Sequence, residues 1–582
     1  MKKILKKAWI FTLLTVILFT HCIPVRTFAA ENDDLSDIGS RIEAFVKENK
    51  DTMAGMAVSV MDSEEIIYTG YFGDTDIGNH IPVDDETVME WGSISKLQVW
   101  VCVMQLKEKG LIDLEEDICT YLPEGFLTKL KYDRPITMLD LMDHQAGFDE
   151  VPFIWTGSAD SLMPLDKWLK RTEPMQQYEP GTVTSYSNWG TALAAYIVQC
   201  VSGQPYGEYV REHIYEPLGM EHTSILPDAS DNSWVQSKRK ELKTYPADLD
   251  GKPLSYGDYY TNCYPAGACM STMADMQRFA MALMNEDSPL FERPGTHSEL
   301  LSPSNCYGDT DTGSNYHGFW RNVFYNGTVI GHLGGTVGCS SALWIDIEKK
   351  ECIAVMTNQH EETRFTDGLP ELVFERYEGE LPEFSGIVQA AQTVCSGPLK
   401  MQRLFVTQPL TLEAGKKTHT MINRTDENGI DRFECGSSDL IVRNMSDVLP
   451  DIISIVIYIL SLFMAVILLI AGIIQAVRRR RSRNSVWCII SAGIQLIPVL
   501  VLVRVVMQLM LEQPPFLSID ALRLLFIWIF AVLISNIVLI IHGARKFSQS
   551  GVSKARMVLT FIMLAFSTYG IIYWELFEFW RI

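Results

Sequence analysis

Apolar residues follow two different patterns along the 582-residue chain, and the change between them divides it into regions. Before Leu449, apolar runs of strand or helix length alternate with polar turns. After it come four longer apolar runs, at about residues 450–477, 486–511, 521–542 and 557–577. About 20 consecutive apolar residues are enough to cross a bilayer as a helix. The pattern therefore predicts a membrane domain over residues 449–582 with four transmembrane helices.

The region before this membrane domain mixes strand-like and helical patterns. Two β-rich runs within Ala54–Gly73 predict a hairpin, and further strand-like runs lie between Thr328 and Gln359. Helical patterns lie between them, at residues 137–144, 188–203, 206–215 and 272–286. Strands at both ends with helices between them predict an α/β layer structure over residues 31–380, with a sheet that joins the first and last strands. Residues 381–448 predict a small β-rich connector.

The N-terminus has the layout of a secretory signal peptide. Four lysines precede an apolar stretch from Ala8 to Thr20, and the small residues Ala29 and Ala30 precede an acidic, polar start. We therefore predict a signal peptide over residues 1–30, with a retained N-terminal anchor as the alternative. In either case the domain that follows is expected outside the cytoplasm.

Charges in the loops of the membrane domain predict the same orientation. Arginines at 478–483 follow the first apolar run, and residues 543–556, between the third and fourth runs, hold four basic residues. The loop between the second and third runs holds only acidic charges. Because basic loops stay in the cytoplasm, we expect a multi-pass protein of the cell membrane with its large domain on the extracytoplasmic side.

Net charge and cysteine content narrow the partners further. Residues 31–446 hold 32 Lys and Arg against 65 Asp and Glu, an excess of acidic charge that excludes nucleic acid as a partner. Ten of the twelve cysteines lie in this part of the chain, and Cys395 and Cys435 are the best candidates for a disulfide. No metal-ligand spacing and no glycine-rich phosphate loop is present, so we predict neither a metal nor a cofactor.

One short motif suggests nucleophilic chemistry. In EWGSISKLQ, Ser93 stands three residues before Lys96 at the start of an apolar helix. Positions i and i+3 share a helix face, so the amine can reach the hydroxyl, which needs an adjacent base to become a nucleophile. Burial lowers the pKa of a lysine and makes its neutral form attainable. The alternative is a capped helix with a solvated lysine in its first turn.

Two further motifs follow in the chain. Tyr186-Ser-Asn188 stands where a polar loop turns into a helix, and His332-Leu-Gly334 stands on a strand before a glycine-rich turn. The order S-x-x-K, Y-x-N, H-x-G resembles that of the serine β-lactamase and penicillin-binding protein superfamily, especially its class C and D-Ala-D-Ala carboxypeptidase branch. The likeness covers roughly residues 38–359.

This resemblance implies a β-lactamase-like fold, with an antiparallel sheet flanked by helices and an all-helical subdomain. It implies that Ser93 is the nucleophile, with its own backbone N–H as one oxyanion donor. Lys96 and Tyr186 are expected to move the proton between nucleophile, leaving group and deacylating water. Which of the two is the base is disputed even for related patterns, so we assign them jointly.

The resemblance also implies a substrate cleft. Asn188 is expected to hold the substrate amide and the lysine amine, and the strand from His332 through Gly334 to line the cleft. The backbone N–H of Gly335 is then the second oxyanion donor. Taken singly, these residues also fit ordinary structural roles: a helix cap for Asn188 and a buried core histidine for His332.

The third motif bears on the reaction. His332 stands where β-lactamases usually have lysine, and histidine there is more similar to the carboxypeptidases, D-aminopeptidases and esterases of the family. No obvious glutamate for activating a deacylating water is recognisable. We expect a membrane-anchored serine hydrolase that cuts an amide or ester, such as a D-amino-acid peptide, a cell-wall D-alanyl ester or an exported acyl-D-amino-acid prodrug. The alternatives are a β-lactam sensor with slow turnover and a true β-lactamase.

Overall fold

The structure is a computed structural model that describes most of residues 35–581. The residues left undescribed within that range are 152–153, 250–251, 255–258, 309, 378–383, 394–399, 405–406, 413–421, 426–430, 435, 479–482, 501–502, 505–518 and 547–553. The predicted signal peptide and the predicted Cys395–Cys435 pair lie outside the described residues. The described residues form two compact units: the larger comprises residues 35–385 with 411–441, and the smaller comprises 386–410 with the residues from 442 onward.

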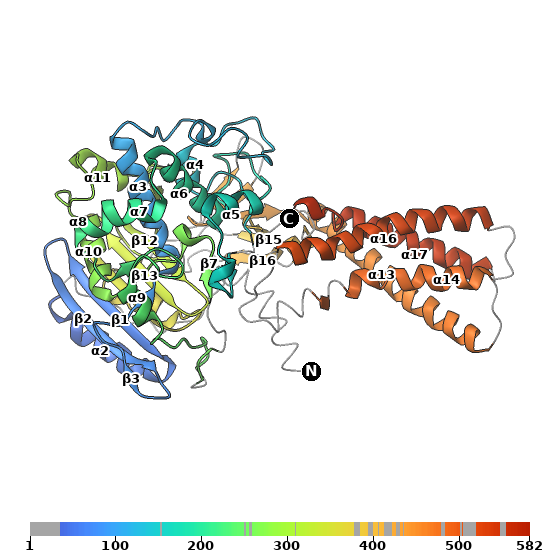
Figure 1. The fold of residues 1–582 in the computed structure, drawn as a ribbon, viewed down its shortest axis with the longest axis horizontal. Coiled ribbons are helices and arrows are strands. Elements are labelled where there is room, and N and C mark those ends of the chain that lie inside the picture. The colour runs from blue at the N-terminus through green and yellow to red at the C-terminus, as the bar shows by residue number, and fades with distance from the viewer. Residues whose placement is uncertain are drawn as a thin grey trace. The chain divides into compact units, whose positions relative to one another are not determined.

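An antiparallel sheet is the centre of the larger unit (Figure 1). Its strands are β1 Gly55–Asp62, β2 Ile66–Asp76, β3 Ile81–Pro82, β9 Asn305–Cys306, β10 Gly313–Tyr316, β11 Phe319–Arg321, β12 Val329–Gly335, β13 Ser340–Asp346 and β14 Glu351–Thr357. They follow the order β3-β2-β1-β14-β13-β12-β11-β10-β9. Val58 of β1 lies opposite Val355 of β14, so the first and last strands pair as predicted. The predicted hairpin is β1 with β2.

Helices cover both faces of this sheet and form a helical part beside it (Figure 1). The helices of the larger unit are α2 Ile38–Asn49, α3 Lys96–Glu108, α4 Met138–Met142, α5 Leu165–Thr172, α6 Asn188–Ser202, α7 Tyr206–Val210, α8 Glu216–Leu218, α9 Ser233–Arg239, α10 Met273–Met284, α11 Pro294–Leu300 and α12 Arg364–Gly368. The four predicted helices correspond to α4, α6, α7 and α10. The third of these continues as a π-helical turn over Arg211–Tyr215.

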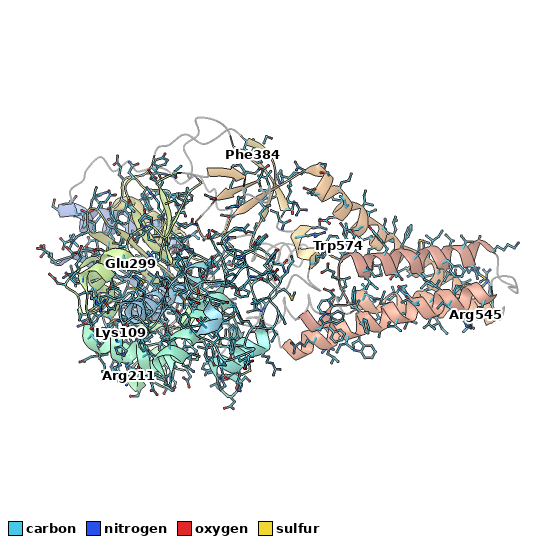
Figure 2. The ribbon with its side chains drawn as sticks, turned by 90° about the horizontal axis from the view of Figure 1, so that it is seen from above. Lys109, Arg211, Glu299, Phe384, Arg545 and Trp574 are labelled. Atoms are coloured by element: carbon cyan, nitrogen blue, oxygen red, sulfur yellow. The ribbon has the colours of Figure 1, made fainter. Side chains whose placement is uncertain are left out.

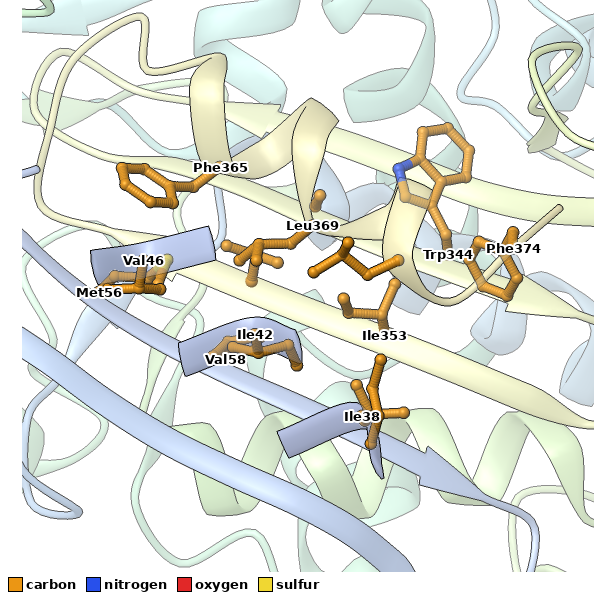
Figure 3. Packing of buried hydrophobic residues seen from close by; sticks show 14 of the residues in the cluster. Ile38, Ile42, Val46, Met56, Val58, Trp344, Ile353, Phe365, Leu369 and Phe374 are labelled. Carbon is orange, nitrogen blue, oxygen red and sulfur yellow. The ribbon is translucent and has the colours of Figure 1, made fainter. Parts of the chain in front are cut away.

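One face of the sheet is covered by α2 and the segment that includes α12 (Figure 3). Ile38, Ile42 and Val46 recur every four residues, so they form one apolar stripe along α2. This stripe packs against Val58 of β1 and its neighbours, with Phe365 in the same cluster. Every residue of β1 is buried except the last, as expected for a central strand covered on both faces.

Helix α10 packs on the opposite face of the sheet, and α3 lies in the core of the same unit. Gln277 of α10 donates to Ser59 Oγ on β1 at 2.8 Å and to Thr69 Oγ1 on β2 at 2.7 Å. In α3 every residue except Lys107 is buried, so the apolar helix predicted after Ser93 lies inside the core. Short strands connect these parts: β4 Met89–Glu90, β5 Trp155–Thr156, β6 Thr223–Ser224, β7 Tyr260–Thr261 and β8 Met270–Ser271.

Residues 384–443 contain the strands of the predicted β-rich connector. They are β15 Phe384–Ala390, β16 Thr407–Leu412, β17 Ile422–Thr425, β18 Asp431–Glu434 and β19 Leu440–Arg443. β17 pairs with β18, and β18 pairs with β19, both antiparallel. The β-rich character of this segment is therefore confirmed for its described part.

The smaller unit is dominated by long apolar helices, α13 Met445–Val477, α14 Arg483–Ile494, α16 Ile519–Lys546 and α17 Lys554–Tyr573. Among the described residues, three stretches are long and apolar enough to span a membrane: Met445–Gln475, Phe526–Arg545 and Lys554–Tyr573. In Figure 2, Arg545 and Trp574 lie at opposite ends of these helices. The predicted second span, 486–511, is apolar over Val486–Leu500, and most of its remainder lies outside the described residues.

Candidate active site

Ser93 and Lys96 lie where a 3₁₀ turn, Gly92–Ser95, runs directly into α3. Side chains at i and i+3 eclipse in a 3₁₀ turn, so the hydroxyl and the amine point the same way. Lys96 Nζ lies 2.9 Å from Ser93 Oγ. Ser93 is half-buried whereas Lys96 is fully buried, so the hydroxyl is the member of the pair that solvent and a substrate can reach.

Lys96 makes two further contacts that fix its amine. Its Nζ donates to Asn188 Oδ1 at 2.7 Å and to the carbonyl oxygen of Ala266 at 2.7 Å. An ammonium has three N–H donors, whereas a neutral amine has two donors and one lone pair. In a neutral Lys96 amine, the two N–H groups donate to Asn188 and Ala266. The lone pair is then directed at the Ser93 hydroxyl. The arrangement suits both protonation states of a general base.

Tyr186 and Asn188 come from the loop that leads into α6. Tyr186 OH donates to Ser93 Oγ at 2.8 Å. The residue between them, Ser187, caps α6 by accepting from the backbone N–H of Gly190 at 3.0 Å. The cap fixes the start of the helix, and an extended Ser187 turns its two neighbours toward α3. The structure therefore brings the first two motifs into one hydrogen-bonded cluster.

The third motif lies at the end of β12, beside the turn that holds Ser93. A Cβ on Gly334 would lie 2.0 Å from the carbonyl oxygen of Trp91, so only glycine permits this approach. Gly335 is exposed, and a Cβ there would meet nothing within 4 Å. Its backbone is thus at the open side of the site, where the sequence predicts an oxyanion donor.

His332 lies on the buried side of the same strand. Its ring contacts that of Trp320 in a tilted arrangement with centroids 3.9 Å apart, and the ring centroid of Tyr186 lies 6.2 Å from its own. His332 Nδ1 is hydrogen-bonded to the carbonyl oxygen of Leu333. His144 completes this aromatic cluster, with its ring centroid 4.6 Å from that of Tyr186. Burial lowers the pKa of His332 well below the ordinary value, so the imidazole is neutral.

Glu150 is a residue of the site that sequence reasoning missed. It is 5% exposed, and its Oε2 accepts from the backbone N–H of Asn188 at 2.6 Å and from Asn188 Nδ2 at 3.0 Å. Its contacts are with Asn188, and they do not test the expectation that the site has no obvious glutamate for activating a deacylating water. Nothing in the sequence separates Glu150 from the many other acidic residues, because its burial arises from a partner 38 positions away.

Burial dominates the electrostatics of these groups. It lowers the pKa of Lys96 to about 7, against the opposing effects of Cys263 and Glu150. It raises the pKa of Glu150 to about 7, against hydrogen bonds from Asn188 and Val151. It also raises the pKa of Tyr186 above its ordinary value, so this phenol keeps its proton and acts as a donor. With a pKa of about 7, Lys96 is partly uncharged at neutral pH, and in that form its amine can accept a proton from Ser93.

Two tryptophans next to the motifs are structural. Trp91 and Trp189 are both fully buried. Trp91 Nε1 donates to Ser271 Oγ at 2.7 Å, and Trp189 Nε1 donates to the carbonyl oxygen of Leu169 at 3.2 Å. Their role is therefore core packing beneath the motifs.

Comparison with known proteins agrees with this arrangement. The Beta-lactamase family model matches residues 40–378 of the chain, which is more than half of it. The chain belongs to the beta-lactamase family. This family of serine hydrolases includes penicillin-binding proteins, and the predicted superfamily, fold class and enzyme class are confirmed.

Curated relatives are similar over the same part of the chain. Penicillin-binding protein 4* of Bacillus subtilis is 22% identical over 325 residues, which cover 54% of this chain and 70% of that protein. The D-alanyl-D-alanine-carboxypeptidase/endopeptidase AmpH of Escherichia coli is 25% identical over 242 residues, or 40% of this chain and 58% of that protein. The crystal structure of D-amino acid amidase from Ochrobactrum anthropi aligns with 22% identity and a TM-score of 0.47, covering 58% of this chain and 96% of that one.

Proposed function

We propose that this serine hydrolase cleaves an amide or ester bond through an acyl-enzyme on Ser93, with Lys96 as the base. The observation that carries the proposal is that Ser93 Oγ is contacted by both Lys96 Nζ, at 2.9 Å, and Tyr186 OH, at 2.8 Å. A serine hydroxyl with a base and an acid both within hydrogen-bond distance has what nucleophilic attack requires.

Acylation follows from these contacts. The neutral Lys96 amine takes the proton of Ser93 as its Oγ attacks the carbonyl carbon of the substrate. The developing oxyanion is positioned to meet the backbone N–H groups of Ser93 and Gly335, at the edge where β12 approaches the turn. Collapse of the tetrahedral intermediate breaks the bond to the leaving group, which takes a proton from Tyr186.

Deacylation reverses the proton movements. Tyr186, re-protonated by the Lys96 ammonium, has its hydroxyl next to the ester oxygen of the acyl-enzyme. A water that attacks the acyl carbon gives its proton to the neutral Lys96 amine, and Ser93 Oγ takes a proton from Tyr186 as the acyl group leaves. The neutral His332 and the ring of Trp320 surround Tyr186 and keep its environment dry.

The substrate class and the cellular location belong to the same proposal. The Escherichia coli relative is a D-alanyl-D-alanine-carboxypeptidase/endopeptidase, which supports a substrate with a D-amino acid beside the scissile bond. Three long apolar helices support an anchor in the membrane. The basic residues at 478–483 and 543–556 support an orientation with the hydrolase domain outside the cytoplasm.

A substrate panel tests this function. Full-length protein in detergent micelles is incubated with a D-alanyl-D-alanine peptide, a D-amino acid amide, a D-alanyl ester and a chromogenic cephalosporin, each beside S93A. We expect turnover of an amide or ester by the wild type and none by S93A. Stable acylation by the cephalosporin without turnover of any substrate would instead indicate a β-lactam receptor. Protease accessibility of the domain in intact cells tests its location.

A further inference from the structure

Glu150 has no place in the proposed reaction, yet one of its carboxyl oxygens contacts Asn188, a residue of the second motif. Its Oε2 accepts two hydrogen bonds from Asn188, at 2.6 and 3.0 Å, and its Oε1 accepts the backbone N–H of Val151 at 2.8 Å. Asn188 Oδ1 in turn accepts from Lys96 Nζ at 2.7 Å. A single side-chain amide thus lies between a buried carboxyl group and a buried amine.

This bridge fixes which way the Asn188 amide is turned. Because an ionised carboxylate can only accept hydrogen bonds, Nδ2 faces Glu150 and Oδ1 faces Lys96 when Glu150 is charged. The reverse orientation would direct Nδ2 at the lysine amine and the amide oxygen at a carboxyl oxygen. The second N–H of Nδ2 is left to face a substrate, and the lysine lone pair is left to face Ser93.

We propose that Glu150 is a positioning residue that acts through Asn188 on Lys96: it holds the amide in the productive orientation, and its charge controls how readily Lys96 gives up its proton. The proposal rests on the proposed function, because it assigns to Lys96 the role of the base. It adds a carboxyl group to the site that none of the three motifs contains.

None of the other titratable groups around Lys96 and Glu150 carries a charge near pH 7 that could replace the negative charge of Glu150. Those that interact electrostatically with Lys96 or Glu150 are Cys263, Tyr186, His144 and His332. Burial raises the pKa of the Cys263 thiol and of the Tyr186 phenol, and it lowers the pKa of His144 to about 3. All four are neutral near pH 7. Among the described residues around the pair, only Glu150 and Lys96 change charge in that range.

The sign of the effect follows. A negative Glu150 favours the protonated form of Lys96, so removing this charge lowers the pKa of the lysine. The pH above which Ser93 reacts should then move down when Glu150 is neutralised. A residue that only stabilised the fold would reduce the amount of active protein and leave this pH unchanged.

The experiment measures the second-order rate at which a fluorophosphonate labels Ser93 between pH 5 and 9. In this reaction Ser93 Oγ displaces fluoride from phosphorus and its proton passes to the base. The full-length wild type in detergent micelles is compared with E150Q, E150D and E108Q. Glu108 is a matched control: it is buried, it accepts backbone N–H bonds from Glu292 and Arg293, and it lies at the far end of the same helix as Lys96.

We expect the acidic limb of the E150Q profile to move to lower pH by roughly one unit, the lower end of the effect of a neighbouring charge. Its plateau should fall several-fold, because glutamine has one acceptor oxygen where the carboxyl group has two, so it cannot accept from both Asn188 and Val151. E150D should keep the wild-type limb with a lower plateau, and E108Q should keep both.

A folded E150Q with the wild-type limb would overturn the proposal. If E150Q does not fold, E150A decides, because it also removes the charge: an acidic limb moved to lower pH supports the proposal, and the wild-type limb overturns it. Absence of labelling in the wild type at every pH would instead remove the proposed function, and this inference with it. The two failures are therefore distinguishable.

Discussion

Gly92 and Gly335 meet backbone to backbone: a Cβ on Gly92 would lie 2.5 Å from the amide nitrogen of Gly335. Gly92 also has φ +54°, a left-handed conformation that other residues adopt at a cost. The turn that carries Ser93 and the strand that carries the predicted second oxyanion donor are thus held together at a point where no side chain fits.

Gly92→Ala is therefore expected to abolish Ser93 labelling and to lower the melting temperature, because the new methyl group pushes β12 away from the turn. Gly110→Ala is the matched control. Gly110 has φ +71°, but a Cβ there meets nothing within 4 Å. It should cost only the strain of the left-handed conformation, about 1–2 kcal/mol, and leave labelling intact. Equal loss of activity in both variants would contradict this account.

Lys96→Arg tests whether the amine acts as a base. Arginine keeps the positive charge but stays protonated at all accessible pH values. Since burial lowers the pKa of Lys96 to about 7, the wild-type rate should rise with pH through about 7 as the neutral amine forms. Lys96→Arg should lose this limb and at least about 10³-fold in kcat/KM, within the range for removing a general base. A pH profile retained by the arginine variant would exclude Lys96 as the base.

Tyr186→Phe separates acylation from deacylation. The substitution removes only the hydroxyl that donates to Ser93 Oγ, and the ring keeps its place among His144, Trp320 and His332. We expect both steps to slow, and deacylation to slow more, by about 10²-fold or more, so that the acyl-enzyme accumulates in a burst experiment. Circular dichroism checks that the fold is unchanged. A variant with wild-type turnover would show that the phenol carries no proton.

Asp143 links pH to stability. It is 3% exposed, burial raises its pKa to about 7, and its Oδ1 accepts from Ser304 Oγ at 2.7 Å. A carboxyl group with a raised pKa in the folded state is most favourable at low pH, and its contribution is lost as the pH rises through about 7. Asp143→Asn should therefore raise the melting temperature by a few degrees at pH 8 and change it little at pH 5. An equal change at both pH values would contradict the assigned shift.

The sequence was most informative where chemistry and periodicity agree. Ser93-x-x-Lys96 predicts its own geometry, because spacing along one helix turn fixes how two side chains meet. The pairing of β1 with β14 was predictable because apolar runs of strand length lie at both ends of the domain. The long apolar helices follow from length and composition alone.

Other parts of the site depend on contacts between distant segments. Glu150, His144 and Trp320 gather around Asn188 and Tyr186 only after the chain has folded, and no local pattern marks them. The carbonyl of Ala266, which holds the lysine amine across 170 positions, is a backbone group and leaves no trace in the sequence. Such contacts arise from tertiary packing, so they cannot be predicted from the spacing of motifs.

The central claim is that Ser93 is an activated nucleophile that forms a covalent acyl-enzyme. Intact-mass spectrometry of the full-length protein after brief exposure to a fluorescent penicillin, and separately to a fluorophosphonate, tests it most directly, with S93A treated in parallel. We predict a mass increase of one adduct in the wild type and none in S93A. A folded wild type that gains no mass with either probe, or an S93A variant that gains the same mass, would contradict the account.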